Sequence, residues 1–158
     1  MFFFFFNNEK IRGITLANYI LERAECRGAG GVSNLKLQKI LYYVQGYYTA
    51  KYGHPLFPDE IHAWRFGPAV PDVYYEFSRF GSDPLKRHES ADMSALNSEE
   101  MDLVNSVIDA KLAMTTMDLV RASVSEPPFL RVTENNAYIK PYTVVSIDDI
   151  KEYFATLI

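Results

Sequence analysis

The stretch SNLKLQKILYYVQGYYTA, residues 33–50, decides the fold expected of this chain. Its apolar side chains recur at helical spacing, and Tyr42 and Tyr43 widen the apolar stripe toward the flanks. Ser33 or Asn34 can cap the first turn, because a short polar side chain accepts a hydrogen bond from a free backbone N–H there. We therefore expect a central core helix carrying Leu37, Ile40, Leu41, Val44, Tyr47 and Tyr48 on one face.

Amphipathic patterns with terminal signals predict further helices on both sides of this segment. Asn97 with Glu100, and Ser146 with Asp149, form capping-box patterns, and each precedes a helical apolar repeat. Thr15 is a candidate N-cap, and Pro71 suits the first turn of a helix because an N–H is not needed there. The other predicted helices cover residues 15–27, 71–80, 97–112, a short segment that ends before Pro127, and 146–157.

The remaining segments predict a small β element and surface connections. Residues 61–66 combine aromatic and β-branched residues and favour a strand, while residues 53–58 resemble a turn. Residues 81–96 are polar, and we expect residues 129–145 to be extended. The predicted fold class is mainly α (α+β): a compact bundle of about six helices with a small two- or three-stranded β element.

The length and composition indicate one globular domain. With 158 residues, 48% of them hydrophobic, the chain can bury its own core. We place the domain at residues 14–158, after a phenylalanine-rich N-terminal extension over residues 1–13. The run Phe2–Phe6 is too short to span a bilayer and lacks the features of a secretory signal. It predicts a packing strand or a frayed start, or else an aromatic plug that docks in a partner or in a second copy, a homodimer.

Charge and cysteine content narrow the classes of function. The net charge of −4 argues against the broad cationic field that nucleic-acid binding uses. Cys26 is the single cysteine, which excludes an intramolecular disulfide and fits a reducing compartment. We expect a cytoplasmic protein whose main partner is neither a membrane nor a nucleic acid.

No residue pattern predicts catalysis, a metal site or a cofactor. His54, His62 and His88 are not at the spacing of a helical zinc site, and no serine lies in a GxSxG turn. The carboxylate pairs Glu99-Glu100 and Asp148-Asp149 both open predicted helices, where negative charge stabilises the free N–H groups. The sequence thus predicts no catalytic residues, no metal and no cofactor.

Aromatic residues make up 15% of the chain, and many cluster between Tyr42 and Phe80. Most belong to the core, yet the predicted helices and strand cannot hide every ring. Tyrosine, tryptophan and arginine are favoured anchors of protein interfaces. For Tyr43, Tyr75 and Trp64, surface recognition and core packing both remain open.

Three segments together resemble a known family. They are KLQKILYY at residues 36–43, PLF at residues 55–57 and AWRFGPAVP at residues 63–71. In this combination the chain is similar to the Panacea domain of SocA-like antitoxins, a family that includes phage-associated GepA-like proteins. The resemblance implies a mainly helical fold and an antitoxin that neutralises a cognate protein toxin by direct contact. It also implies, for some relatives, delivery of the toxin to a protease as an adaptor.

On this resemblance, two sets of residues are expected to matter. Exposed side chains around the motifs would contact the toxin, with Lys36, Lys39, Tyr43, Arg65 and Tyr75 as the candidates. The second set would form the rigid framework of the motifs, or be present because the fold needs them: Leu37, Gln38, Tyr42, Trp64, Gly67, Pro68 and Pro71.

Two alternatives belong to different classes. Antitoxins often repress their own promoters, so a DNA-associated transcriptional regulator is one, although the acidic charge and the lack of a clear recognition helix oppose it. The other is a phage-related protein with an enzymatic activity assembled in space and not visible in the sequence.

Overall fold

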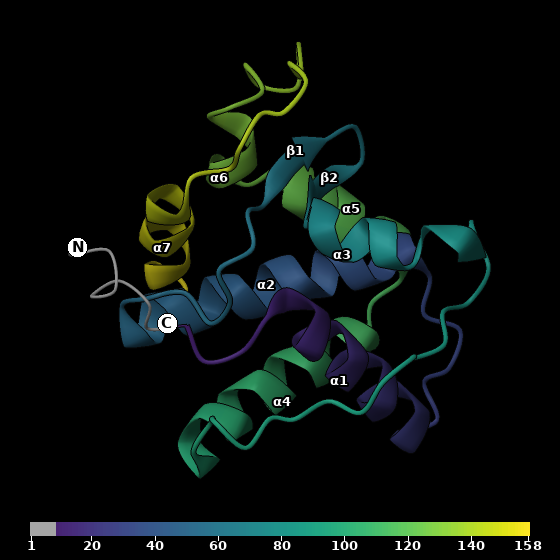
Figure 1. Cartoon of the computed structure of the whole chain (residues 1–158). Helices are drawn as coiled ribbons and strands as arrows, with labels where there is room; N and C mark the ends of the chain where they lie inside the picture. Colours follow the sequence, from purple (N-terminus) through teal and green to yellow (C-terminus); the bar gives the residue numbers. More distant parts are fainter. Residues whose placement is uncertain (1–8) are drawn as a thin grey trace, which may run out of the picture.

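A long central helix organises the chain, which a computed structural model describes over residues 9–158. Figure 1 shows this helix, α2 (Asn34–Tyr52), crossing the middle of the molecule. It is buried on most of its circumference, as expected for a helix with partners on several sides. Ser33 Oγ accepts a hydrogen bond from the Lys36 N–H, and Gly53 ends the helix with a φ of 85°. The predicted central helix is confirmed.

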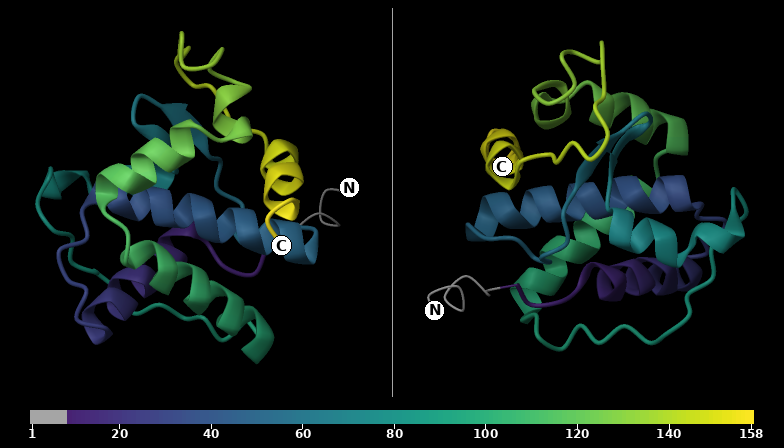
Figure 2. Two further views of the ribbon diagram at one scale, coloured as in Figure 1. Left: turned by 180° about the vertical axis from the view of Figure 1, so that it is seen from behind. Right: turned by 45° about the horizontal axis from the view of Figure 1, so that its top comes forward.

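Helices α1 (Gly13–Cys26) and α4 (Ser98–Leu112) cover one side of α2 (Figures 1 and 2). The Arg23 guanidinium joins them, since its Nε and Nη2 lie 2.7 and 2.8 Å from the two carboxylate oxygens of Asp109. A bidentate pair of this kind fixes both distance and orientation. The two helices therefore form one rigid layer beneath α2.

Helix α1 begins earlier than the sequence predicts. Thr15 is not its N-cap: the helix starts at Gly13, and the Asp59 carboxylate accepts a hydrogen bond of 2.9 Å from the Gly13 N–H. A cap from a distant loop leaves no local signal in the sequence. Nearby, the N–H groups of Lys10 and Ile11 both donate to the Leu56 carbonyl, so part of the predicted N-terminal extension packs on the loop after α2. The Phe2–Phe6 run lies outside the described residues.

The capping box of α4 is confirmed. The Asn97 side chain accepts from the Glu100 N–H, and the Glu100 carboxylate accepts from the Asn97 N–H, both at 2.9 Å. Glu100 is buried, and it also accepts hydrogen bonds from Lys10 and from the Tyr48 hydroxyl of α2. This carboxylate therefore caps one helix and ties it to a second.

A two-stranded antiparallel hairpin lies on the other side of α2. Strands β1 (His62–Trp64) and β2 (Gly67–Ala69) pair so that Trp64 faces Gly67. Residues 143–145 continue this pairing, because the Ala63 N–H donates to the Thr143 carbonyl at 2.9 Å and the Val145 N–H donates to the Ile61 carbonyl at 2.7 Å. The small β element is confirmed.

Short helices complete the upper layer of Figure 1. Beside the hairpin lie α3 (Pro71–Glu76) and the 3-10 helix η2 (Ser78–Phe80), while α5 (Thr116–Val124) packs against β2. Helix α6 (Pro127–Leu130) follows directly.

The prediction of an extended segment over residues 129–145 is wrong for its first part. Pro127 starts a new helical turn, because its fixed φ suits the first position of a helix. Turns then follow, with positive φ at Glu134, Asn135 and Asn136. The extended conformation appears at residues 143–145, beside the hairpin.

Helix α7 (Ile147–Ala155) closes the fold against the C-terminal half of α2 (Figure 2). Ser146 caps it by accepting from two backbone N–H groups. The Asp149 carboxylate binds Arg131 at 2.9 Å, on the turn after α6. The buried Phe154 ring packs edge-on against the Tyr42 ring, with 5.5 Å between centroids. The described residues thus form six α-helices and one small sheet around the central helix α2, which confirms the predicted fold class.

Candidate functional site

The hairpin tip and the neighbouring helix α3 carry a cluster of exposed aromatic rings. Phe66 at the tip is 50% exposed and Tyr75 on α3 is 65% exposed. The half-buried Trp64 and Tyr74 lie between them, with their ring centroids 5.0 Å apart and their planes nearly perpendicular. The Arg65 guanidinium lies 5.4 Å from the centre of the Phe66 ring. We refer to Trp64, Arg65, Phe66, Tyr74 and Tyr75 as the hairpin surface.

Two hollows flank the hairpin surface. The first, of about 620 Å³, lies between the N-terminal end of α2 and the hairpin, and we call it the α2 hollow. The second, of about 800 Å³, lies between the hairpin, α3 and the loop over residues 136–142, and we call it the loop hollow. Trp64, Arg65 and Tyr74 line both, so they form the wall between the two.

The loop over residues 136–142 adds two tyrosines to this region. Tyr138 is 58% exposed and Tyr142 is 88% exposed, and both line the loop hollow. Tyr142 also has a φ of 62°, which is uncommon for an aromatic residue. Strained backbone tends to occur at binding sites, where the surrounding fold holds it in place. The loop therefore belongs with the hairpin surface as a candidate contact region.

The charge around the two hollows is positive. Their lining residues include Lys39, Arg65 and Lys140, and no aspartate or glutamate occurs among them. The chain as a whole has a net charge of −4. The hairpin surface is therefore a local basic and aromatic area on an acidic protein, which favours acidic groups on whatever binds there.

A ladder of amide side chains fixes the hairpin and α3 on α2. The Gln38 Oε1 accepts a hydrogen bond of 2.7 Å from the Val70 N–H, directly after β2, and Gln38 Nε2 donates to Asn34 Oδ1 at 2.9 Å. Asn34 in turn donates to the Tyr74 carbonyl at 3.0 Å. Buried amides with all these partners satisfied make a rigid support. The exposed rings are thus held before any partner arrives.

Lys39 lies beneath the hairpin. Its side chain is 1% exposed, and its ammonium donates to the Pro68 carbonyl at 3.0 Å. Burial lowers the pKa of this ammonium to about 7. Gly67 has a φ of 113°, and a Cβ at this position would lie 2.8 Å from Lys39 Cε and from Ser123 Oγ. Gly67 therefore lets β2 lie directly on the lysine.

A second polar cluster joins α2 to the start of α6. The Tyr42 and Tyr43 hydroxyls donate to the two carboxylate oxygens of Glu126, at 2.9 and 2.8 Å. Burial raises the pKa of Glu126, an effect that these two hydrogen bonds partly oppose. Burial, followed by the nearby Glu126 charge, raises the pKa of both tyrosines. The Lys111 ammonium lies 4.1 Å from the centre of the Tyr43 ring.

The predicted contact residues divide into three groups by exposure. Arg65 and Tyr75 are exposed and lie together on the hairpin surface. The expectation of exposure is wrong for Lys39 and Tyr43, which are 1% and 2% exposed because the hairpin and the Glu126 cluster cover them. Lys36 is half-buried, and its ammonium donates to the Leu112 carbonyl at the end of α4.

The predicted framework residues lie in or beside the core. Trp64 and Pro71 are half-buried, and Pro71 occupies the first turn of α3. The others are buried: Leu37, Gln38, Tyr42, Gly67 and Pro68. Sequence reasoning did not single out Phe66, Tyr138 or Tyr142 as contact residues. The signal in the sequence that could have identified the loop is the pair Tyr138 and Tyr142, which follow Asn135 and Asn136 in a polar segment.

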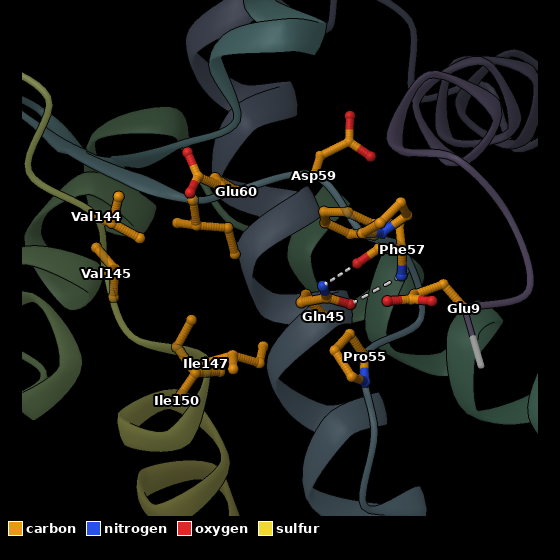
Figure 3. Close-up of a pocket in the computed structure, with 12 residues that line it drawn as sticks. Glu9, Gln45, Pro55, Phe57, Asp59, Glu60, Val144, Val145, Ile147 and Ile150 are labelled. Carbon is orange, nitrogen blue, oxygen red and sulfur yellow. Dashed lines mark hydrogen bonds between the residues drawn. The ribbon is translucent and has the colours of Figure 1, made fainter. Parts of the chain in front are cut away.

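A smaller hollow, of about 240 Å³, lies between α2, the segment before β1 and the start of α7 (Figure 3). Gln45 holds this region, since it donates to the Phe57 carbonyl at 2.7 Å and accepts from the Leu56 N–H at 2.8 Å. Figure 3 shows the Glu9 carboxylate directed toward Gln45, and apolar side chains of α7 on the opposite side. These hydrogen bonds of Gln45 hold the loop after α2 against the helix, so we assign this region a structural role.

Residues 9–158 contain no group of three or more histidine, cysteine, aspartate or glutamate side chains arranged to hold a metal ion. In the same part of the chain, none of the helices has the length and apolar character needed to cross a bilayer.

The fold and the site define a class: a small, mainly helical protein that presents aromatic and basic side chains on a rigid hairpin. The family model described as "Antitoxin SocA-like, Panacea domain" matches residues 37–128, which include most of α2, the hairpin and α3 to α5. The chain belongs to this family.

One curated relative supports the assignment. The protein is similar to Antitoxin SocA of Caulobacter vibrioides (strain NA1000 / CB15N), with 41% identity over 66 residues. The aligned region covers 42% of this chain and 35% of that relative, so the match spans about a third of the length of the curated protein. No solved structure matches the chain.

Proposed function

We propose that the protein is an antitoxin that neutralises a cognate protein toxin by direct contact through the hairpin surface. The observation that carries the proposal is the cluster of exposed Arg65, Phe66 and Tyr75 around a hairpin that the core holds rigidly. Arginine and large aromatic side chains supply most of the binding energy in protein interfaces.

The hairpin surface is the centre of a larger area that a partner can cover. Stable interfaces bury about 800 Å² on each partner. The hairpin surface, both hollows and the loop over residues 136–142 form a continuous area on a protein with a total accessible surface of 8277 Å². Since Gln38 and Asn34 fix the hairpin and α3 in advance, little conformational entropy of these two elements is lost on binding.

The buried candidates have a supporting role in this proposal. Lys39 holds β2 through the Pro68 carbonyl, and Tyr43 holds Glu126 at the start of α6. Lys36 donates a hydrogen bond to the Leu112 carbonyl at the C-terminal end of α4. Direct contact with the toxin is assigned to Arg65 and Tyr75, with Phe66 between them at the tip.

Co-expression tests the proposal. The product of the adjacent open reading frame is expressed alone and with this protein, and growth is measured. The double variant Arg65→Ala/Tyr75→Ala is expected to lose rescue while its melting temperature stays unchanged, because both side chains are exposed. Arg27→Ala is the matched control, since Arg27 is an exposed arginine that lines neither hollow.

The same experiment separates the mechanisms. Rescue with an unchanged amount of toxin, and a complex that co-purifies, supports direct neutralisation. Rescue accompanied by protease-dependent loss of the toxin supports the adaptor role instead. Full rescue by the double variant would show that the hairpin surface is not needed to neutralise the toxin.

A further inference from the structure

The loop hollow lies between two walls that both carry aromatic rings. Figure 1 shows the loop that follows α6 next to β1, and the hairpin and α3 form the other wall. On the hairpin side, the Tyr75 ring lies 6.1 Å from the Trp64 ring and 5.5 Å from the Tyr74 ring, measured between centroids. Tyr138 and Tyr142 line the hollow from the loop. Its volume of about 800 Å³ is in the range of sites that enclose a compact ligand.

The polar groups of these aromatic side chains are free hydrogen-bond donors. One indole N–H and four hydroxyls are offered, by Trp64, Tyr74, Tyr75, Tyr138 and Tyr142. Within residues 9–158 none of these five groups is hydrogen-bonded, and neither the Trp64 N–H nor the Tyr74 hydroxyl is a buried atom that lacks a partner. Solvent, and therefore a ligand, can reach them.

Acceptors are scarce in the same lining. It contains no aspartate or glutamate, and Asn136 is its one side-chain amide among the described residues. The carbonyls of Tyr74 and Tyr75 already accept hydrogen bonds, at 3.0 Å each, from Asn34 and Ser78. A ligand that brings many backbone N–H groups into this hollow would leave them without acceptors, which is costly for a buried donor.

We propose that the loop hollow binds a proline-rich segment of the polypeptide partner in the polyproline II conformation. Each proline supplies a carbonyl acceptor and no N–H. A polyproline II segment makes no internal hydrogen bonds, so its carbonyls are available to the donors of the lining, and aromatic-lined grooves bind such segments in other proteins. The inference rests on the proposed function, because it names the kind of toxin segment that the hairpin surface and the neighbouring loop recognise.

The charge of the lining adds a requirement for an acidic residue next to the prolines. Arg65 and Lys140 are exposed, lie on the two walls, and meet no carboxylate within the lining. Complementary charges across an interface favour the correct partner and fix its register. The expected ligand is therefore a run of prolines flanked by glutamate or aspartate.

The ring geometry disfavours another ligand that uses aromatic and basic groups, a single-stranded nucleic acid. Its bases stack on the faces of aromatic side chains. The Trp64 and Tyr74 planes are inclined by 84°, and the Tyr74 and Tyr75 planes by 85°, so neighbouring rings form no flat platform. Asp72 and Glu76, also on α3, line an acidic hollow that repels a chain of phosphates. A proline ring, which is small and not planar, needs no such platform.

Three blocked hexapeptides test the inference on the full chain. They are Glu-Pro-Pro-Pro-Pro-Glu, the same peptide with glutamine for glutamate, and the same peptide with alanine for proline. Trp64 is the only tryptophan of the chain, so its fluorescence and its indole N–H signal in NMR report on this wall.

The first peptide is expected to shift both signals of Trp64. The glutamine peptide should bind up to about fivefold more weakly for each charge removed, because the ion pairs are exposed. The alanine peptide should bind at least about tenfold more weakly, because its N–H groups find no acceptors in the lining.

Exposed residues supply the variants, so loss of folding does not obscure the result. Tyr75→Ala and Tyr138→Ala each remove a ring from one wall and should weaken binding of the proline peptide by about tenfold, with an unchanged melting temperature. Tyr75→Phe keeps the ring and loses the donor, and should weaken binding by about twofold to tenfold. Phe66→Ala separates the two hollows, because Phe66 lines the α2 hollow and not the loop hollow: toxin rescue should weaken while peptide binding persists. Arg27→Ala should change neither.

Several outcomes would overturn the inference. Equal binding of the proline and alanine peptides, or no binding of the proline peptide, would show that the loop hollow is not a site for proline-rich segments. An oligothymidylate that binds and displaces the proline peptide would assign the hollow to a nucleic acid. If the proline peptide fails while Arg65→Ala/Tyr75→Ala still loses rescue, the proposed function stands and this inference falls. If the peptide binds and the double variant keeps full rescue, the proposed function falls, and with it the assignment of the segment to the toxin.

Discussion

Gly46 lies where the Phe154 ring of α7 rests directly on the backbone of α2. A Cβ at this position would lie 2.4 to 2.6 Å from three ring atoms of Phe154, whereas ordinary van der Waals contacts begin near 3.4 Å. The ring is fully buried, and Tyr47 and Tyr153 pack edge-on against it, with centroids 4.9 and 5.2 Å away. Gly46→Ala therefore forces a movement of about 1 Å in a closed aromatic cluster.

The expected magnitude follows from two opposing effects. Overpacking of a filled core costs about 1–3 kcal/mol. Alanine gains about 1 kcal/mol over glycine in a helix interior. Gly46→Ala should thus destabilise the wild-type chain by up to about 2 kcal/mol. In a Phe154→Leu background the ring is gone, so the same change should be neutral or stabilise by about 1 kcal/mol.

Urea unfolding followed by circular dichroism measures all four members of this double-mutant cycle. The coupling between the two positions should be about 1–3 kcal/mol, with unchanged m-values. An equal effect of Gly46→Ala in both backgrounds would refute the contact between α7 and α2 at Gly46.

Three further predictions concern single groups. Glu126→Ala leaves the buried hydroxyls of Tyr42 and Tyr43 without their acceptor and should lower the free energy of unfolding by about 2–4 kcal/mol, a loss that is smaller when both tyrosines are phenylalanine. Lys39 has a folded-state pKa of about 7 and an unfolded value near 10.4, so the unfolded chain binds more protons than the folded chain between these two pH values. The free energy of unfolding should therefore rise with pH in this range, by up to about 1.4 kcal/mol per pH unit. Urea titrations of Lys39→Met over the same pH range should lack this rise. Asn97→Ala removes the α4 cap and should cost about 1 kcal/mol in thermal unfolding, with little effect on toxin rescue.

Local signals in the sequence were sufficient for most of the helices. The apolar repeat of α2 and the capping box of Asn97 and Glu100 depend on neighbours within a few residues, and both occur as predicted. The start of α1 was not predictable in this way, because it depends on Asp59, which is 46 residues from Gly13. The helical turn at Pro127 did have a local signal, the fixed φ of proline, which the prediction of an extended segment did not use.

The site was harder to predict, because exposure depends on which elements cover a residue. Lys39 and Tyr43 are a basic and an aromatic residue, yet the hairpin and Glu126 bury them. Arg65 and Tyr75 are likewise a basic and an aromatic residue but stay exposed, since one lies at a turn and the other on the outer side of α3. Helical or strand periodicity does not distinguish these cases.

The construction of the hairpin has a consequence for how such proteins diversify. Arg65 and Phe66 are the two residues between the strands, both are exposed, and the bonds that hold the hairpin come from Gln38, Lys39 and the backbone. Replacing the two tip residues therefore leaves those bonds intact. On the proposed function, these two residues can therefore change, and with them the toxin that is bound, while the bonds that support the hairpin stay the same.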